Sequence, residues 1–350
     1  MYNPRMVIMP KITRREYGIL GALAVATTLG TILFAQAPAQ LTTNPDVYIH
    51  PDLRKAADGA RQGRFPAPAP PPTGGPAVVQ RTVPGPKGAP DVKVTIVNGG
   101  GPAATSRPAI LHIHGGGYTG GNAAIMVPTL REMAAALDCV IVSVDYRLAP
   151  ATKFPGSLED NYAALKWLSG NARELGVDAS RIAVMGESAG GGHAAMLAIA
   201  ARDRGEVPLV YQALIYPMLD DRSGTTRPVA PQIGTMVWTR DANRAGWTAL
   251  LGVPAGGPQA PEGAVPARVA NLAGLPPAFI GVGGIDLFVE EDIAYAQRLN
   301  NAGVPVELNV VPGAFHAFDM FEPNAPVTIR FRAALTNALK GAFAGAFKKP

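Results

Sequence analysis

Short apolar runs alternate with amphipathic segments from Ala77 to the C-terminus. The runs expected to be strands are "VVQRTV", "VKVTIVN", "AILHIH", "CVIVSVDY", "RIAVMG", "LVYQALIYP", "PAFIGVGG" and "VPVELNVVPG". Between them, segments such as "SLEDNYAALKWLSGNARELG" and "DIAYAQRLNNAG" have apolar residues at helical spacing, and a terminal helix is expected from about Ala325. Such alternation predicts an α/β fold with a mostly parallel central sheet that helices cover on both faces.

Two regions depart from this rhythm. Residues from about 218 to 272 are rich in Asp, Gly, Pro and Trp and form a connection too long for a simple loop. We expect an insertion with helices of its own, such as "TRDANRAGWTALLG". Residues 40–76 hold a helix-like segment and the Pro-rich linker "PAPAPPPTGGP". The two regions together are predicted to form a helical cap over the strand ends of a catalytic domain that spans residues 77–350.

The first 39 residues have the pattern of a secretory signal peptide. A basic head precedes an apolar run from Tyr17 to about Ala35, and the small residues "APA" follow it, with cleavage expected before Gln40. The pair Arg14-Arg15 resembles a twin-arginine export signal. Because the apolar run approaches the roughly 20 residues of a membrane span, an uncleaved membrane anchor is the alternative. We expect a periplasmic or secreted protein.

Composition and charge exclude several classes of protein. Apolar residues make up 47% and charged residues 16%, which is typical of a folded globular chain. The net charge of +5 falls to +2 without the leader, because the leader carries four positive side chains and one negative. So small a charge does not indicate a partner such as nucleic acid. The single cysteine, Cys139, lies in an apolar run, and no HExxH motif is present. We therefore predict neither a metal ion nor an organic cofactor.

A candidate nucleophile stands in "VMGESAGGG". Gly186 to Gly190 fit the pattern G-x-S-x-G between an apolar strand and a helix of small residues. In that context the serine occupies a strained turn and its hydroxyl projects from the end of the strand. Ser188 is therefore the predicted nucleophile.

A serine nucleophile needs a base, and the base needs an acidic partner. Of the five histidines, His316 lies in a loop after the last predicted strand, whereas His112 and His114 precede Ser188 and His193 follows it by one helical turn. Asp286 directly follows the strand "AFIGVGG". The chain order Ser, Asp, His suits a nucleophile elbow, with Glu290 as an alternative acid.

The glycine block "HGGGYTGG" permits two interpretations. Gly115, Gly117 and Gly120 spell G-x-G-x-x-G after a strand, and Asp145 follows about 25 residues later, as in a dinucleotide-binding site. Alternatively, the block supplies backbone N–H groups to an oxyanion hole. The second interpretation is favoured because the first leaves Ser188, Asp286 and His316 without a role.

Five motifs, taken in order, carry a resemblance to a known family. The motifs "HGGGY", "DYRLAP", "GESAG", "GGIDLFVEE" and "GAFHAF" resemble the hormone-sensitive-lipase-like branch of the α/β-hydrolases, the bacterial family IV esterases. The resemblance covers the chain from about Asp46 onward. It implies an α/β-hydrolase fold with a cap, a nucleophile, acid and base at Ser188, Asp286 and His316, and oxyanion donors at Gly116, Gly117 and Ala189.

The resemblance also assigns supporting roles. Asp145 and Arg147 are expected to be a scaffold pair, and His114 is expected to brace the glycine loop. This chain departs from the common pattern at Glu187, where many relatives have Asp, and at Leu287, where Pro is common. The export leader is also unusual for the family.

The predicted activity is that of a serine carboxylesterase acting on short- to medium-chain esters, with a small-molecule ester as its partner. Two other classes stay open: a ligand-binding pseudo-hydrolase and a dinucleotide-binding oxidoreductase. A peptidase or acyltransferase on the same scaffold is a nearer alternative, because the shape of the pocket sets the choice of acceptor.

Overall fold

The computed structural model describes residues 45–66, 74–99 and 106–347. The predicted leader, residues 1–39, and residues 67–73 of the Pro-rich linker lie outside the described residues. Within the described ranges, no helix combines the length and the apolar character that crossing a membrane requires.

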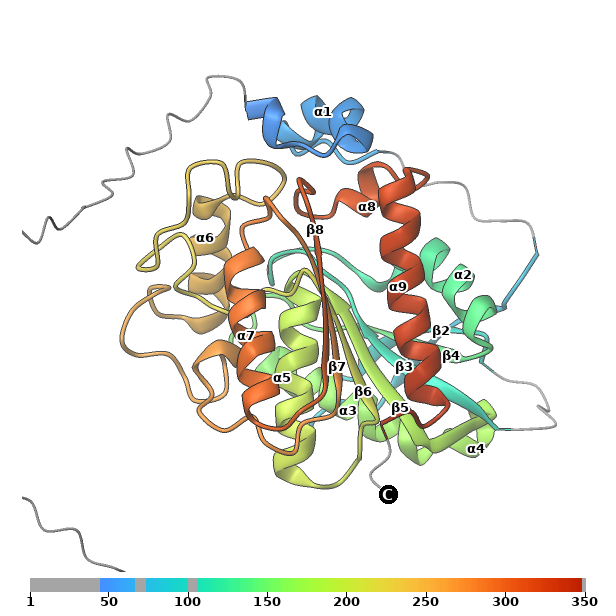
Figure 1. Cartoon of the computed structure of the whole chain (residues 1–350). Helices are drawn as coiled ribbons and strands as arrows, with labels where there is room; N and C mark the ends of the chain where they lie inside the picture. The colour runs from blue at the N-terminus through green and yellow to red at the C-terminus, as the bar shows by residue number, and fades with distance from the viewer. Residues whose placement is uncertain (1–44, 67–73, 100–105, 348–350) are drawn as a thin grey trace, which may run out of the picture. The chain divides into compact units, whose positions relative to one another are not determined.

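The described residues contain one sheet of eight strands in the order β1-β2-β4-β3-β5-β6-β7-β8 (Figure 1). Strand β2 runs antiparallel to both of its neighbours, and all other neighbouring pairs are parallel. Every predicted apolar run is a strand, which confirms the mostly parallel sheet. The strands are β1 (Val78–Val83), β2 (Val92–Val97), β3 (Arg107–Ile113), β4 (Val140–Asp145), β5 (Val177–Glu187), β6 (Tyr211–Ile215), β7 (Ala278–Gly283) and β8 (Val306–Val311).

Helices cover both faces of this sheet. Helices α2 (Val127–Leu137) and α9 (Pro326–Phe343) pack together on one face, and α3 (Gly156–Gly170) and α5 (Ala189–Arg204) pack together on the other (Figure 1). Helix α7 (Val289–Asn301) packs against β7 and β8. The shorter elements are η3 (Ala123–Met126), α4 (Ala172–Leu175) and α8 (Phe318–Phe321).

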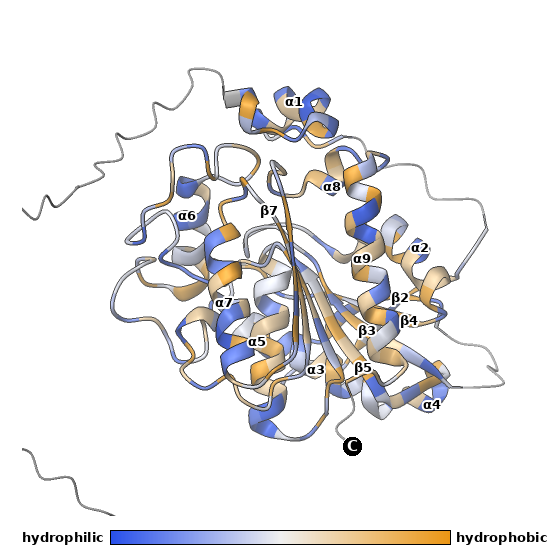
Figure 2. Cartoon of the chain, in the orientation of Figure 1, coloured by the Kyte–Doolittle hydropathy of each residue, from blue (hydrophilic) through white to orange (hydrophobic). Residues whose placement is uncertain are grey.

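The central strands form the core. Strands β4 to β7 are almost wholly buried at their apolar positions, including Cys139 just before β4, and Figure 2 shows their hydrophobic colouring against more polar outer helices. Helix α5 approaches the sheet closely through its glycines. A Cβ on Gly190 would lie 2.0 Å from the carbonyl oxygen of Ile113 in β3. The small residues of "SAGGGHAA" therefore let α5 lie directly behind the strand ends.

The long connection between β6 and β7 contains α6 (Arg240–Leu251) and η4 (Pro266–Arg268), so the helix predicted at "TRDANRAGWTALLG" is confirmed. The N-terminal segment forms η1 (Pro45–Tyr48), η2 (Pro51–Ala56) and α1 (Ala57–Arg61). The N–H of His50 donates to the carbonyl of Gly313 at 2.9 Å, and the N–H of Val237 donates to the carbonyl of Ala60 at 3.0 Å. This segment thus contacts both the β8–α8 loop and the β6–β7 connection. That the two regions act as a cap stays a prediction.

Candidate active site

Ser188 lies on the sharp turn between β5 and α5. Its backbone has φ 56° and ψ −122°, a strained conformation for a residue with a side chain. Gly186 and Gly190 make the turn possible, because a Cβ on Gly186 would lie 2.3 Å from the carbonyl oxygen of Gly190. The N–H of Ser188 donates to the carbonyl of Ile215 at 2.9 Å, which ties the turn to β6. The predicted elbow geometry is present, and the hydroxyl projects at the carboxyl ends of the parallel strands.

The structure brings Ser188, His316 and Asp286 into one hydrogen-bonded chain. His316 Nε2 lies 2.9 Å from Ser188 Oγ, and His316 Nδ1 lies 2.8 Å from Asp286 Oδ2. Asp286 follows β7 and His316 follows β8, so three strand ends contribute one group each. With the carboxylate accepting from Nδ1–H, the lone pair on Nε2 is free to accept the hydroxyl proton.

Aromatic rings fix the orientation of the imidazole. The ring centroids of Tyr216 and His316 lie 4.9 Å apart, with an interplanar angle of 68°. Those of Phe288 and His316 lie 5.2 Å apart, with an interplanar angle of 86°. The N–H of Phe288 also donates to Asp286 Oδ1 at 3.1 Å. Both partners of the His316–Asp286 bond are thus held by the same short stretch after β7.

The glycine loop after β3 lies beside the nucleophile. A Cβ on Gly115 would lie 3.3 Å from Ser188 Cβ. Gly116 and Gly117 have φ of 123° and 60°, which side chains rarely adopt. Ala189 is the first residue of α5, where a backbone N–H has no partner within the helix. This arrangement can present backbone amides to a developing negative charge next to the hydroxyl.

The geometry does not favour the dinucleotide interpretation. Asp145, the candidate ribose-binding acid, accepts a hydrogen bond from the N–H of Ala123 at 2.6 Å and so serves the start of η3. The carbonyl of Gly116 accepts from the N–H groups of Thr119 and Gly120, so the loop folds back on itself before any helix begins. A phosphate cradle needs the glycines to open a helix directly.

The other histidines near the sheet support the scaffold. His112 bridges Ser143 Oγ at 2.8 Å and Glu187 Oε2 at 2.9 Å, and it is fully buried. His114 Nδ1 lies 2.7 Å from the carbonyl oxygen of Gly115, as expected of a residue that braces the loop, and burial lowers the pKa of its imidazole. Burial lowers the pKa of His193 to about 3. Across the described part of the chain, no group of three His, Cys, Asp or Glu side chains could hold a metal ion.

Two supporting assignments are corrected. Asp145 and Arg147 do not pair with each other, because the guanidinium of Arg147 makes three charge-assisted bonds to buried Asp160 on α3, the shortest at 2.7 Å. Glu290, the alternative acid, is 41% exposed and lies 3.9 Å from Arg227, not at the imidazole. It is in the first turn of α7, where a carboxylate suits the helix dipole.

Trp238, in the β6–β7 connection, is a site residue that the sequence analysis missed. Its Cη2 atom lies 2.1 Å from the place that a Cβ on Gly117 would occupy, and its ring centroid lies 6.5 Å from that of His316. Trp238 follows a loop without periodicity, so nothing in the pattern connected it to the glycine block. The available signal was the tryptophan content of this region, because Trp238 and Trp247 are two of the three tryptophans in the chain.

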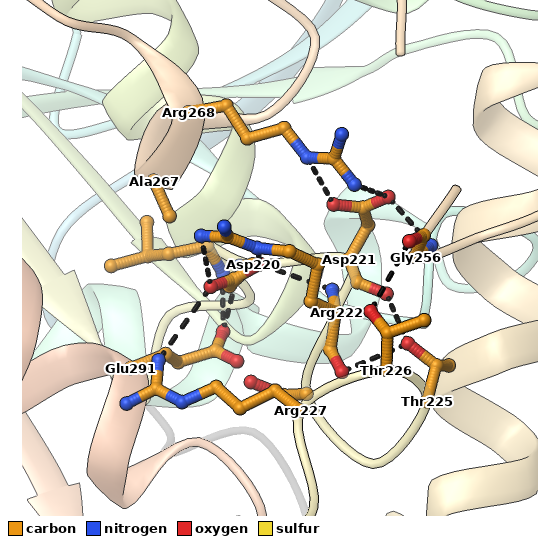
Figure 3. Close-up of polar contacts among 12 residues, drawn as sticks. Asp220, Asp221, Arg222, Thr225, Thr226, Arg227, Gly256, Ala267, Arg268 and Glu291 are labelled. Atoms are coloured by element: carbon orange, nitrogen blue, oxygen red, sulfur yellow. Dashed lines mark hydrogen bonds and ion pairs between the residues drawn. The ribbon is translucent and has the colours of Figure 1, made fainter. Parts of the chain in front are cut away.

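A buried polar network holds the connection that carries Trp238 (Figure 3). Asp221 binds Arg268 through two bonds of 2.8 and 2.7 Å, and Asp220 binds Arg222 through two of 2.8 and 2.9 Å. Glu291 on α7 accepts from the N–H groups of Leu219 and Asp220, and burial raises the pKa of its carboxyl well above the ordinary value. The first residues of the connection are thereby fixed against α7, next to the loop of Asp286.

Known proteins share this arrangement of elements. A model of the α/β-hydrolase fold matches residues 110–320. Carboxylesterase NlhH of Mycobacterium tuberculosis is 40% identical over 240 residues, which are 66% of this chain and 74% of that protein. The solved structure of a bacterial heroin esterase has a TM-score of 0.73 at 33% identity and covers 86% of this chain and 99% of its own.

A second solved structure agrees. Esterase LipW from Mycobacterium marinum has a TM-score of 0.69 at 37% identity, with 77% of this chain and 82% of that chain covered. The family model alone spans more than half of the present sequence. The protein therefore belongs to the α/β-hydrolase family, in its hormone-sensitive-lipase-like branch of esterases.

Proposed function

We propose that this protein is a serine carboxylesterase that hydrolyses short- to medium-chain esters through an acyl-enzyme intermediate. The observation that carries the proposal is the hydrogen-bonded chain from Ser188 Oγ through the His316 imidazole to Asp286, with bonds of 2.9 and 2.8 Å. The names of the relatives, carboxylesterase and esterase, support an ester as the substrate.

The first half of the reaction forms the acyl-enzyme. His316 Nε2 takes the hydroxyl proton while Ser188 Oγ attacks the ester carbonyl carbon, and Asp286 stabilises the resulting imidazolium. The amides of Gly116, Gly117 and Ala189 donate to the oxyanion, where one such donor is worth about 3 kcal/mol. His316 then gives its proton to the alcohol oxygen, and the C–O bond breaks.

The second half releases the acid. Water loses a proton to His316 Nε2 and attacks the acyl carbon, and the same amides hold the second oxyanion. Collapse of this intermediate returns the proton to Ser188 Oγ. The chemistry needs only these side chains and amides.

Hydrolysis of p-nitrophenyl butyrate by the purified protein tests the proposal. We expect turnover that Ser188→Ala abolishes, whereas Ser169→Ala, a matched change on α3, leaves it intact. Labelling by a serine-reactive phosphonate, read by mass spectrometry, should add one adduct at Ser188 in the parent protein. Equal turnover in the parent and in Ser188→Ala would show that the proposed function is wrong.

We further propose that residues 1–39 direct export. The support is the order of basic, apolar and small residues in the sequence. Cell fractionation of the intact chain, with Arg14 and Arg15 both changed to Lys as the comparison, tests it. We expect a shortened protein outside the cytoplasmic fraction, and retention of full-length protein in the membrane fraction would favour an anchor.

A further inference from the structure

Trp238 is the least buried of the aromatic residues near the base. Three aromatic rings of the described residues contact or approach the His316 imidazole, those of Tyr216, Phe288 and Trp238. Tyr216 and Phe288 are buried, at 1% and 0% exposure, so they pack behind the imidazole. Trp238 is half-buried. Of the three, it is the residue that keeps solvent-accessible surface.

The same ring covers the glycine loop. Three atoms of the six-membered ring of Trp238 lie within 3.0 Å of the position that a Cβ on Gly117 would take, so the indole packs directly on the Gly117 backbone. Gly246 lets α6 approach the glycine loop, because a Cβ on Gly246 would lie 2.7 Å from the carbonyl oxygen of Gly117. The indole therefore spans the space between the glycine loop and His316.

The position of the indole is fixed by an unusual backbone. The N–H of Trp238 donates to the carbonyl of Met236 at 2.7 Å, which closes a three-residue γ-turn around Val237. Val237 has φ 61°, a genuine outlier for a β-branched side chain. Its N–H is held by the carbonyl of Ala60 in α1 at 3.0 Å. Strain of this kind persists where the surroundings over-determine it, and it marks functional sites.

The far end of the side chain is fixed as well. Trp238 Nε1 donates to Asn243 Oδ1 at 3.2 Å, and the fully buried Asn243 donates in turn to the carbonyl of Ser223 at 2.9 Å. The indole is thus anchored at its backbone and at its ring nitrogen. A ring held at both ends forms a rigid wall, not a mobile surface side chain.

The geometry of the tetrahedral intermediate indicates which part of the ester lies against the Trp238 indole. In the tetrahedral intermediate the oxyanion points to the amides that include Gly117, and the alcohol oxygen points to His316 Nε2, which protonates it. A surface between Gly117 and His316 therefore borders the alcohol group, whereas the acyl chain extends in another direction.

We propose that Trp238 is a specificity-determining residue that selects esters with flat or slender alcohol groups, such as aryl and short primary alkyl esters. This inference rests on the esterase function proposed above. A planar alcohol group can stack on the indole, whereas a puckered ring meets its rigid face.

The test compares phenyl acetate with cyclohexyl acetate, which share the acyl group and the carbon count of the alcohol. We expect Trp238→Ala to lower the ratio of kcat/KM for phenyl over cyclohexyl acetate by about tenfold, the scale on which pockets discriminate small differences in shape. The ratio for phenyl acetate over phenyl butyrate, which varies only the acyl group, should stay within about twofold of the parent value. Trp167→Ala, which removes another half-buried indole on α3, should leave both ratios unchanged.

Each outcome is decisive. If Trp238→Ala leaves the alcohol ratio as in the parent, or changes the acyl ratio instead, the inference is overturned while the esterase function stands. If the parent cleaves neither acetate, the proposed function itself fails. Should Trp238→Ala not fold, Trp238→Leu, which keeps apolar bulk but no flat ring, must still shift the alcohol ratio in the same direction, and an unshifted ratio counts against the inference.

Discussion

Replacement of Gly117 by Ala creates a steric clash between the glycine loop and the indole of Trp238. The added Cβ would lie 2.1 Å from Trp238 Cη2, whereas ordinary van der Waals contact begins near 3.4 Å. The indole cannot swing aside freely, because Asn243 Oδ1 accepts from its N–H and the carbonyl of Ala60 accepts from the N–H of the preceding residue, Val237. One of the two groups must therefore move by about 1 Å or more, a displacement that can cost about 100-fold in rate.

The backbone adds a second cost. Gly117 has φ 60°, and a residue with a side chain loses about 1–2 kcal/mol in that left-handed conformation. The easiest relief is a rotation of the Gly117 peptide, which turns its N–H away from the oxyanion. Since one oxyanion donor is worth about 10²–10³ in kcat, we expect Gly117→Ala to lower kcat by about that factor.

Steady-state kinetics on a short ester, together with a urea unfolding curve, measures both costs. Gly120→Ala is the matched control, because its nearest contact would be the Gly116 carbonyl oxygen at 3.7 Å. In the Trp238→Ala background the Gly117→Ala penalty should shrink by about tenfold, since only the backbone cost remains. A kcat within about threefold of the parent, or an equal penalty in both backgrounds, would refute the argument.

Three further changes test other parts of the molecule. Asp286→Asn should lower kcat about 10⁴-fold with the fold intact by circular dichroism, because an amide N–H facing Nδ1 would leave the proton of His316 on Nε2. His193→Leu should reduce the loss of stability on acidification, measured by urea unfolding at pH 7 and pH 5. Burial sets the pKa of His193 at about 3, so between there and its unfolded value of 6.5 only the unfolded chain binds the proton and stability falls as the pH drops. Asp160→Asn should lower the free energy of unfolding by about 1–3 kcal/mol, since the buried carboxylate accepts three side-chain bonds from Arg147, and an unchanged urea midpoint would contradict this.

The sheet could be predicted because each strand is a short apolar run bounded by polar or glycine-rich turns. The positions of Ser188, Asp286 and His316 followed from the same pattern. Each stands just after an apolar run, and the carboxyl ends of parallel strands share one edge. Strand ends therefore place the three side chains at one edge of the sheet, and the G-x-S-x-G motif and the chain order Ser, Asp, His single them out.

The contacts of the cap region could not be predicted in this way. Trp238, Asn243 and Ala60 meet through loops and short helices whose paths no periodicity describes. The family resemblance had implied that Asp145 and Arg147 are a scaffold pair. The strand ends at Asp145, so the alternation of side chains along a strand no longer says where Arg147 points. Asp145 accepts from the N–H of Ala123 in η3, and Arg147 donates to Asp160 on α3.

Backbone strain is the property that most sharply separates the site from the scaffold, and the sequence does not show it. Of the seven described non-glycine residues with positive φ, Ser188 is the nucleophile of the proposed reaction, and four more lie beside site residues: Tyr118, Tyr216, Val237 and Ala317. Tyr118 follows Gly117, Val237 precedes Trp238, Ala317 follows His316, and Tyr216 packs on the His316 ring. A left-handed residue with a side chain is unfavourable by about 1–2 kcal/mol, so the surrounding core must offset several such costs in one small region. That concentration is difficult to explain by packing alone, because relaxed turns would serve the fold equally well. It is expected if the loops are held so that a hydroxyl, an imidazole, an indole and a row of amides face one point, and it predicts that relaxing any of these turns gives a more stable but slower enzyme.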